Sequence, residues 1–155
     1  MQGRRLIFLT LLAVTACAGH RQAPPASAAP PFLLGGFSDD YGAQYEITPT
    51  EWVQLPRARY RIVRWDVIGQ FAIAQNDPGN PSDGNLWTRI DWVELPGMAP
   101  YFWGFCYTAY RAPTAAAAES VTAANRATPR TGCNGFPFSR MRRRTPDSGA
   151  LGGDT

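Results

Sequence analysis

Carboxylates are the side chains with which a folded domain of this chain could perform acid–base chemistry. The single histidine, His20, lies in a proline-rich segment near the N-terminus. The acidic candidates Asp66, Asp91 and Glu94 lie in strand-like segments that also carry arginines. Arg89 and Asp91 are two residues apart and share one face of a strand, so we expect an ion pair rather than two catalytic carboxylates. The sequence therefore predicts no catalytic residues and a domain that is not an enzyme.

A polar segment at 76–85, NDPGNPSDGN, offers oxygen atoms that a calcium ion could use. The candidate ligands are Asp77, Asn80, Asp83 and Asn85. The segment lacks the spacing and the late glutamate of an EF-hand. Because Asn and Asp are also favoured turn residues, we expect a turn-rich loop with no metal, and no cofactor elsewhere in the chain.

The five tryptophans are the strongest indication of a binding function. The ligand-binding hypothesis takes these residues as a platform or cavity: Trp65, Trp87, Trp92, Arg89 and Asp91. One predicted strand face would combine Arg59, Arg61, Val63 and Trp65, and mixed faces of this kind occur in ligand-binding barrels. The alternative, which we favour, is that the aromatic side chains fill the core of a small domain.

The N-terminus has the order of a secretory signal, with Arg4 and Arg5 before an apolar run at 6–14. Nine apolar residues are too few to span a bilayer, which takes ~20. Ordinary cleavage after Ala18 is one possibility. The sequence Val14-Thr15-Ala16-Cys17 resembles the lipobox of bacterial lipoproteins. That resemblance implies cleavage before Cys17, a diacylglyceryl thioether on its sulfur and a membrane anchor.

Three cysteines leave one unpaired if a single disulfide forms. If Cys17 is acylated, Cys106 and Cys133 form the pair. Such a crosslink is worth roughly 3 to 4 kcal/mol. Neither a free thiol nor a zinc site of His and Cys is then available to the domain.

The net charge of +3 falls to +1 when Arg4 and Arg5 leave with the signal. The sequence therefore predicts no nucleic-acid partner. Residues 17–31 are rich in Pro and Ala and predict an extended tether. By the lipoprotein resemblance, Ala18 after the acylated cysteine implies the outer membrane in a Gram-negative cell, so we expect a location in the cell envelope.

Strand-like segments follow one another through the rest of the chain, bounded by turn signals. They lie at 44–48, 51–55, 59–68, 70–75, 86–95 and 101–110. In 86–95, Leu86, Thr88, Ile90 and Trp92 alternate with Trp87, Arg89, Asp91 and Val93, which predicts a half-buried strand. The alanines after Thr114 predict a helix at 114–127, ended by Pro129. We expect an antiparallel barrel or strongly curved sheet of about six to eight strands, calycin-like, with a sandwich as the alternative.

The predicted boundaries are a signal at 1–16, the lipidated cysteine and tether at 17–31, a β domain at 32–139, and a basic, then flexible, tail at 140–155. Segments such as GGFSDDYG and GCNGF are similar to small exported bacterial domains of no established activity. Gly36-Phe37 is similar to the start of lipocalins, which place a tryptophan there instead. The arginines at 140–144 could contact an anionic surface.

Three functions remain open on the sequence. The first is an envelope lipoprotein whose β domain binds a small ligand, a glycan or a protein partner. The second is a structural subunit of an envelope complex. The third is a carboxylate-dependent hydrolase of envelope polysaccharide that uses Asp66 and Asp91.

The lipobox predicts the mass of the mature protein. Protein extracted from its native membranes should begin at Cys17 and carry added acyl mass in an intact-mass spectrum. A chain that begins at Gly19 without added mass would contradict the anchor and indicate simple secretion.

Overall fold

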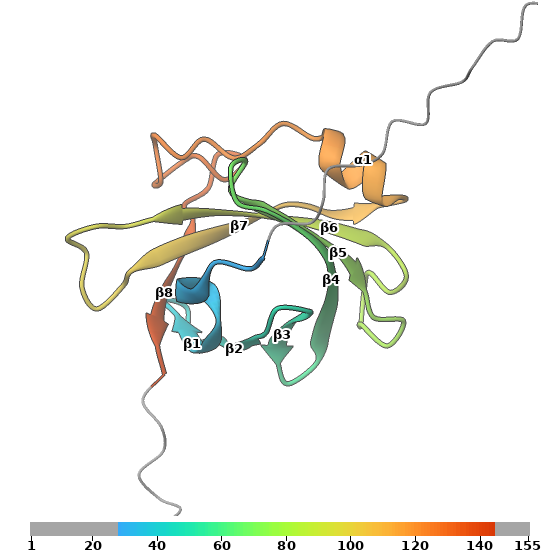
Figure 1. Ribbon diagram of the computed structural model, residues 1–155, viewed down its shortest axis with the longest axis horizontal. Coiled ribbons are helices and arrows are strands. Elements are labelled where there is room, and N and C mark those ends of the chain that lie inside the picture. The colour runs from blue at the N-terminus through green and yellow to red at the C-terminus, as the bar shows by residue number, and fades with distance from the viewer. Residues whose placement is uncertain (1–27, 145–155) are drawn as a thin grey trace, which may run out of the picture.

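Eight short strands are the main regular elements of residues 28–144, the part of the chain that the computed structural model describes (Figure 1). They are β1 Gly35–Asp39, β2 Gln44–Ile47, β3 Glu51–Leu55, β4 Ala58–Asp66, β5 Phe71–Asn76, β6 Trp87–Glu94, β7 Trp103–Ala112 and β8 Ser139–Arg143. Each strand pairs antiparallel with the next, and β8 returns to β1. The sheet is therefore a closed barrel, which confirms the mainly β prediction and excludes the sandwich.

The period-2 pattern of β6 is confirmed. Ile90 and Trp92 point into the barrel and belong to its central apolar cluster. Arg89 and Asp91 point outward, yet they are 5% and 0% exposed because other parts of the chain cover them. This strand therefore has two buried faces, and the prediction of a half-buried strand is wrong because the segment after β7 covers its outer face.

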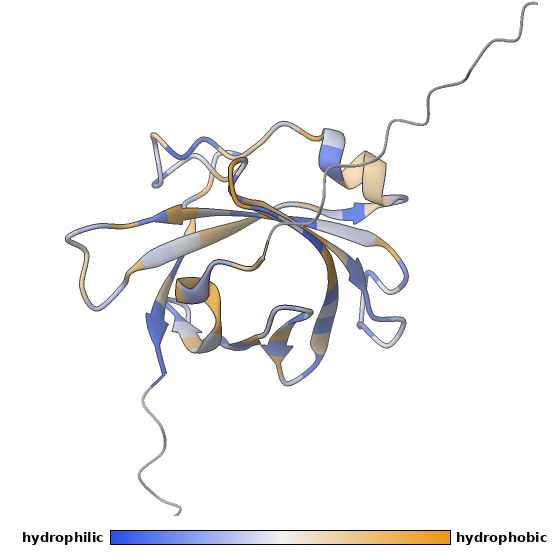
Figure 2. Ribbon diagram, viewed as in Figure 1, coloured by the Kyte–Doolittle hydropathy of each residue, from blue (hydrophilic) through white to orange (hydrophobic). Residues whose placement is uncertain are grey.

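The alternation in β4 is interrupted by a β-bulge. The register shifts between Ile62 and Arg64, which leaves Val63 as the extra residue. Trp65 consequently faces the interior and is 4% exposed, whereas Val63 is 40% exposed. Figure 2 shows the stripes of alternating hydropathy along this strand. The predicted shared face of Trp65, Val63 and Arg61 is wrong, because a bulge reverses the orientation of every later side chain.

Aromatic side chains fill the interior of the barrel. The ring centroids of Trp65 and Trp92 are 5.7 Å apart, and those of Trp52 and Trp103 are 5.9 Å apart. Opposite Trp65 the neighbouring strand carries the small residue Ala72. An eight-stranded barrel is just wide enough to be filled by side chains, and this one is a packed core over most of its length.

One end of the barrel is closed by the 3₁₀ helix η1, Pro31–Leu33. Leu33 is fully buried there. The guanidinium of Arg143 stacks on the ring of Phe37 at 4.6 Å and donates a hydrogen bond to the backbone oxygen of Leu34 at 2.5 Å. The last strand thus fastens the N-terminal turn across this end.

The basic residues expected in a C-terminal tail belong instead to the closing strand. Arg140 forms an ion pair with Asp40 at 2.8 Å, and Arg144 forms one with Glu46. Of the four arginines between 140 and 144, Arg142 alone has no side-chain partner within residues 28–144. The domain boundary predicted at residue 139 is therefore too early. The rest of the predicted tail, 145–155, lies outside the described residues.

A lateral cover lies outside the barrel over β5, β6 and β7, and it consists of α1 and the segment 121–138 (Figure 1). The helix α1, Ala115–Ser120, is shorter than the predicted 114–127, and Val121 has an extended backbone. Thr114 does cap it, because its hydroxyl accepts a hydrogen bond from the Ala117 amide at 3.1 Å. Within residues 28–144 there is no helix with the length and apolar character needed to cross a membrane.

The disulfide between Cys106 and Cys133 is present and confirms the predicted pair. It joins the lateral cover to β7, with the two Cα atoms 5.5 Å apart. Phe138, 1% exposed, packs beside it with Val93 and Leu95 in a second apolar cluster outside the barrel. The covalent bond and this cluster together hold the cover on the sheet.

Removal of the disulfide should weaken the fold measurably. The variant with Cys106→Ser and Cys133→Ser should lose roughly 3 kcal/mol of unfolding free energy, because the crosslink no longer restricts the unfolded chain. Urea denaturation with and without reductant measures this loss. Wild type in reductant should match the variant, and equal stability of all samples would contradict the prediction.

Candidate functional site

The inward-facing side chains change from apolar to polar along the barrel. Near η1 they include Phe37, Ile47 and Met141, all at most 2% exposed. At the opposite end the inward positions form a polar ring that we call the mouth: Asp39, Tyr45, Gln54, Tyr60, Asn76, Thr88, Tyr107 and Ser139. The mouth is therefore the end of the barrel at which a polar ligand could be recognised.

Asp39 is a buried carboxylate at the mouth, with 5% of its surface exposed. Its Oδ1 accepts hydrogen bonds from the amides of Tyr41 at 2.9 Å and Ala43 at 2.8 Å. Its Oδ2 accepts one from the Tyr45 hydroxyl at 2.9 Å. Burial, and then the neighbouring carboxylate, raise the pKa of Tyr45, so the phenol stays protonated as a donor. No arginine within residues 28–144 forms an ion pair with Asp39.

A depression of about 460 Å³ opens beside Asp39. It is lined by Asp39, Tyr45, Gln54, Phe105, Cys106, Tyr107, Tyr110, Cys133 and Ser139. Tyr110, 53% exposed, stands at its outer edge. The lining joins aromatic surface to a carboxylate, an amide and a hydroxyl, which is the composition of a small-molecule site.

A second depression of about 300 Å³ adjoins the first, and Gln54 lines both. It contains another buried carboxylate, Asp83, which is 8% exposed. Burial, and then the charge of Asp83, raise the pKa of Tyr60 to about 12. Arg57 lies at the exposed rim of this depression. Across the described part of the chain, Asp83 has no ion-pair partner within 4.0 Å.

Some buried polar atoms inside the barrel have no hydrogen-bond partner within residues 28–144, and one of them, the Tyr107 hydroxyl, belongs to a residue of the mouth. The Tyr107 hydroxyl and the indole N–H groups of Trp52 and Trp103 make no hydrogen bond to residues 28–144. Burial raises the pKa of Tyr107, so its hydroxyl remains a neutral donor. Unsatisfied buried groups cost free energy, and a polar ligand or water that reaches Tyr107 from the first depression would recover part of it.

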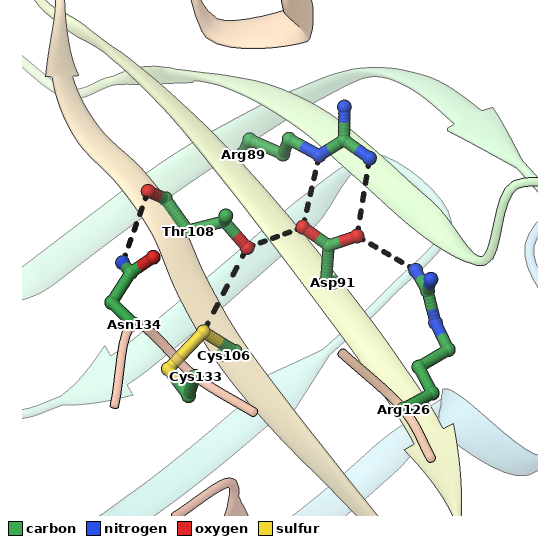
Figure 3. Close-up of a disulfide and its surroundings, with 7 residues drawn as sticks. All are labelled: Arg89, Asp91, Cys106, Thr108, Arg126, Cys133 and Asn134. Atoms are coloured by element: carbon green, nitrogen blue, oxygen red, sulfur yellow. Dashed lines mark hydrogen bonds and ion pairs between the residues drawn. A yellow bond between two sulfur atoms is a disulfide. The ribbon is translucent and has the colours of Figure 1, made fainter. Parts of the chain in front are cut away.

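The predicted ligand residues Arg89 and Asp91 form a structural ion-pair network under the lateral cover (Figure 3). Arg89 binds the Asp91 carboxylate through Nε at 2.9 Å and Nη2 at 3.2 Å. Arg126, from the lateral cover, approaches the other side at 2.7 Å, and the Thr108 hydroxyl donates to Oδ2. These partners satisfy the fully buried carboxylate and leave it no acceptor role toward a ligand. The sequence-based expectation of an Arg89–Asp91 ion pair is confirmed.

The three predicted ligand tryptophans are not brought together on one surface. Trp65 and Trp92 belong to the packed interior, and the Trp65 indole donates to the backbone oxygen of Pro49 at 2.8 Å. Trp87 lies outside the barrel and packs with Ala112 and the helix α1. The favoured interpretation of these aromatic residues as core is the one that the packing supports.

The loop at 76–85 uses its polar side chains to hold its own backbone. Asn80 accepts a hydrogen bond from the Arg59 amide at 2.8 Å and donates to the Arg59 oxygen at 3.0 Å. Asp77 accepts from Gly79 at 2.8 Å, and Asn85 adopts a left-handed backbone with φ of 64°. In the described range, 28–144, no three His, Cys, Asp or Glu side chains group as metal ligands. The other calcium candidate, Asp83, lies at the mouth instead.

Asp66, among the predicted residues, stands apart from the mouth. Asp66, a candidate of the hydrolase hypothesis, accepts a hydrogen bond from the Gly69 amide at 2.7 Å in the β4–β5 turn. Cys17, the predicted lipidation site, lies outside the described residues. A depression of about 600 Å³ on the outer surface, lined by Tyr41, Met98 and Arg130 among others, shares no lining residue with the two depressions at the mouth.

Sequence reasoning missed the residues that form the mouth. Asp39, Gln54 and Ser139 come from three different strands, and the strand at 35–39 was not predicted. The available signal was the two-residue spacing of Phe37 and Asp39, which places a carboxylate on the inward face. Comparison of the chain with protein-family models, curated proteins and solved structures finds no match.

Asp91→Asn should destabilise the protein strongly. It removes the charge that neutralises two arginines, and breaking a buried ion pair from one side costs about 3 to 5 kcal/mol. Denaturant unfolding measures the change, with Asp66→Asn as a matched control of the same chemistry. The control should stay within about 1 kcal/mol of wild type, because Asp66 is more exposed and Asn retains an acceptor. Equal effects of the two substitutions would contradict a special role for Asp91.

Proposed function

We propose that the protein is a lipid-anchored component of the cell envelope whose barrel is a non-enzymatic binding module, with the mouth as its ligand site. The observation that carries the proposal is the 460 Å³ depression beside Asp39. It opens from an otherwise packed barrel and combines aromatic side chains with polar groups that the fold leaves available. Barrel mouths are common positions for small-molecule sites.

The anchor and the location are supported by the sequence and by the disulfide. The lipobox at Cys17 would attach the chain to a membrane. The predicted tether at 17–31 extends too far, because Pro31 already belongs to η1, so the segment before η1 would hold the barrel away from the membrane. A disulfide suits an oxidising compartment outside the cytoplasm. With Ala18 after the acylated cysteine, the outer membrane is the proposed site in a Gram-negative cell.

The hydrolase alternative has less support. Asp91 is occupied by Arg89 and Arg126, and Asp66 caps a turn. The two carboxylates that this hypothesis names are therefore not available on either side of a glycosidic bond. A role as a binding module requires only the shape and chemistry of the mouth.

Mapping of amide chemical shifts tests the proposal. We expect small molecules from an envelope-metabolite panel to perturb ¹⁵N-labelled full-length protein chiefly at Asp39, Gln54, Tyr107 and Ser139. Perturbations confined to the outer depression at Tyr41 and Met98, or none with any compound, would contradict the mouth as the site.

A variant whose larger side chain fills the depression at the mouth tests the same site. Ser139→Tyr should weaken binding of any hit about tenfold or more, because a bulky side chain occupies the depression. Thr122→Tyr adds the same bulk at an exposed position of the lateral cover and should leave affinity unchanged. Equal affinities of the two variants would place the ligand elsewhere.

A further inference from the structure

The mouth holds negative charge that the fold does not neutralise. Asp39 is 5% exposed and Asp83 is 8% exposed. The third buried aspartate, Asp91, is bound by two arginines, but neither mouth carboxylate has an ion-pair partner within residues 28–144. Buried charges in proteins are normally paired or bound to a cation. Two carboxylates without a counter-charge therefore give this end of the barrel a negative potential that would favour a positively charged ligand.

The two carboxylates differ in how the fold supports them. Asp39 receives three hydrogen bonds, which hold its orientation but supply no charge. The carboxylate of Asp83 accepts no hydrogen bond from the described residues, and the nearby Arg57 is exposed at the rim without reaching it. Both acids thus retain acceptor capacity toward a ligand.

An aromatic strip runs between these two acids. The ring centroids of Tyr45 and Phe105 are 5.4 Å apart, those of Phe105 and Tyr107 are 5.0 Å apart, and those of Tyr107 and Tyr60 are 5.5 Å apart. Tyr45 contacts Asp39, and Tyr60 lies in the field of Asp83. Aromatic faces attract cations, and the attraction is greater where water is partly excluded.

We infer that the mouth binds an organic ammonium ion, with Asp39 supplying the opposing charge in the first depression, Asp83 adding negative charge from the adjoining depression, and the ring of Tyr107 contacting its alkyl groups. This inference rests on the proposed binding function and names its ligand class. An anion would meet uncompensated like charge, and a neutral sugar would leave the buried carboxylates unneutralised. An ammonium ion satisfies both the charge and the aromatic surface.

Calorimetry with charged probes and their neutral isosteres tests the ligand class. The full-length acylated protein in detergent is titrated with choline and phenylethylammonium, and in parallel with the neutral molecules dimethylbutanol and phenylethanol. Each pair has nearly the same shape and differs in charge. We expect at least one ammonium ion to bind about tenfold or more tightly than its isostere.

Charge-removing variants assign the effect to the mouth. Asp39→Asn retains an acceptor oxygen for the loop amides, and Asp83→Asn preserves side-chain size. Each should weaken binding of the ammonium ion about tenfold. Asp77→Asn is the matched control, since it removes the same charge from an exposed position in the loop of Asp83 and should have no effect.

Two results would overturn the inference. Equal binding of ammonium ions and isosteres would show that the mouth recognises shape without charge. Unchanged ammonium binding in both Asp39→Asn and Asp83→Asn would place the cation elsewhere. In either case the chemical-shift mapping remains decisive for the proposed function, because a neutral compound that still binds at Ser139 would preserve the binding module while removing its ammonium specificity.

Discussion

The neutralisation of Asp91 is the interaction on which the lateral half of the structure depends. Its carboxylate, fully buried, is bound by Arg89 from its own strand and by Arg126 from the lateral cover. Arg126 also donates to the backbone oxygens of Trp92 at 2.8 Å and Gln70 at 2.7 Å. One arginine therefore connects the cover, the β4–β5 turn and β6. The disulfide adds a covalent link to the same region (Figure 3).

The three buried aspartates have different surroundings. Asp91 lies outside the sheet, where two arginines make it part of the scaffold. Asp39 lies at the mouth and Asp83 lines the depression beside it. Hydrogen bonds orient the Asp39 carboxylate, whereas Asp83 is buried without such bonds. Neither has an ion-pair partner within residues 28–144. The inferred ammonium site would give these two carboxylates a role, because a bound cation supplies the counter-charge that the fold does not. The packed interior beneath gives the mouth a rigid floor.

Much of the fold could be predicted from the sequence, and the site could not. The alternation in β6 predicted that Trp92 and Asp91 lie on opposite faces of the strand, and the cysteine count predicted the pair Cys106–Cys133. The predicted helix is too long because a high alanine content favours helix throughout 114–127 and does not indicate that the backbone becomes extended at Val121. The bulge at Val63 is set by pairing with β5, so a single strand cannot reveal it. The mouth requires barrel closure, which alone brings residues as distant in the chain as 39, 54 and 107 together.

The central claim is that the charges of Asp39 and Asp83 serve binding rather than folding. The most direct test is the unfolding free energy of Asp39→Asn and Asp83→Asn in the absence of ligand, measured by denaturant titration. The account predicts values within about 1 kcal/mol of wild type, with Asp83→Asn equal or more stable, because each substitution relieves an unpaired buried charge. A loss of about 3 kcal/mol or more in both variants would contradict it, since such a loss would make these carboxylates part of the scaffold.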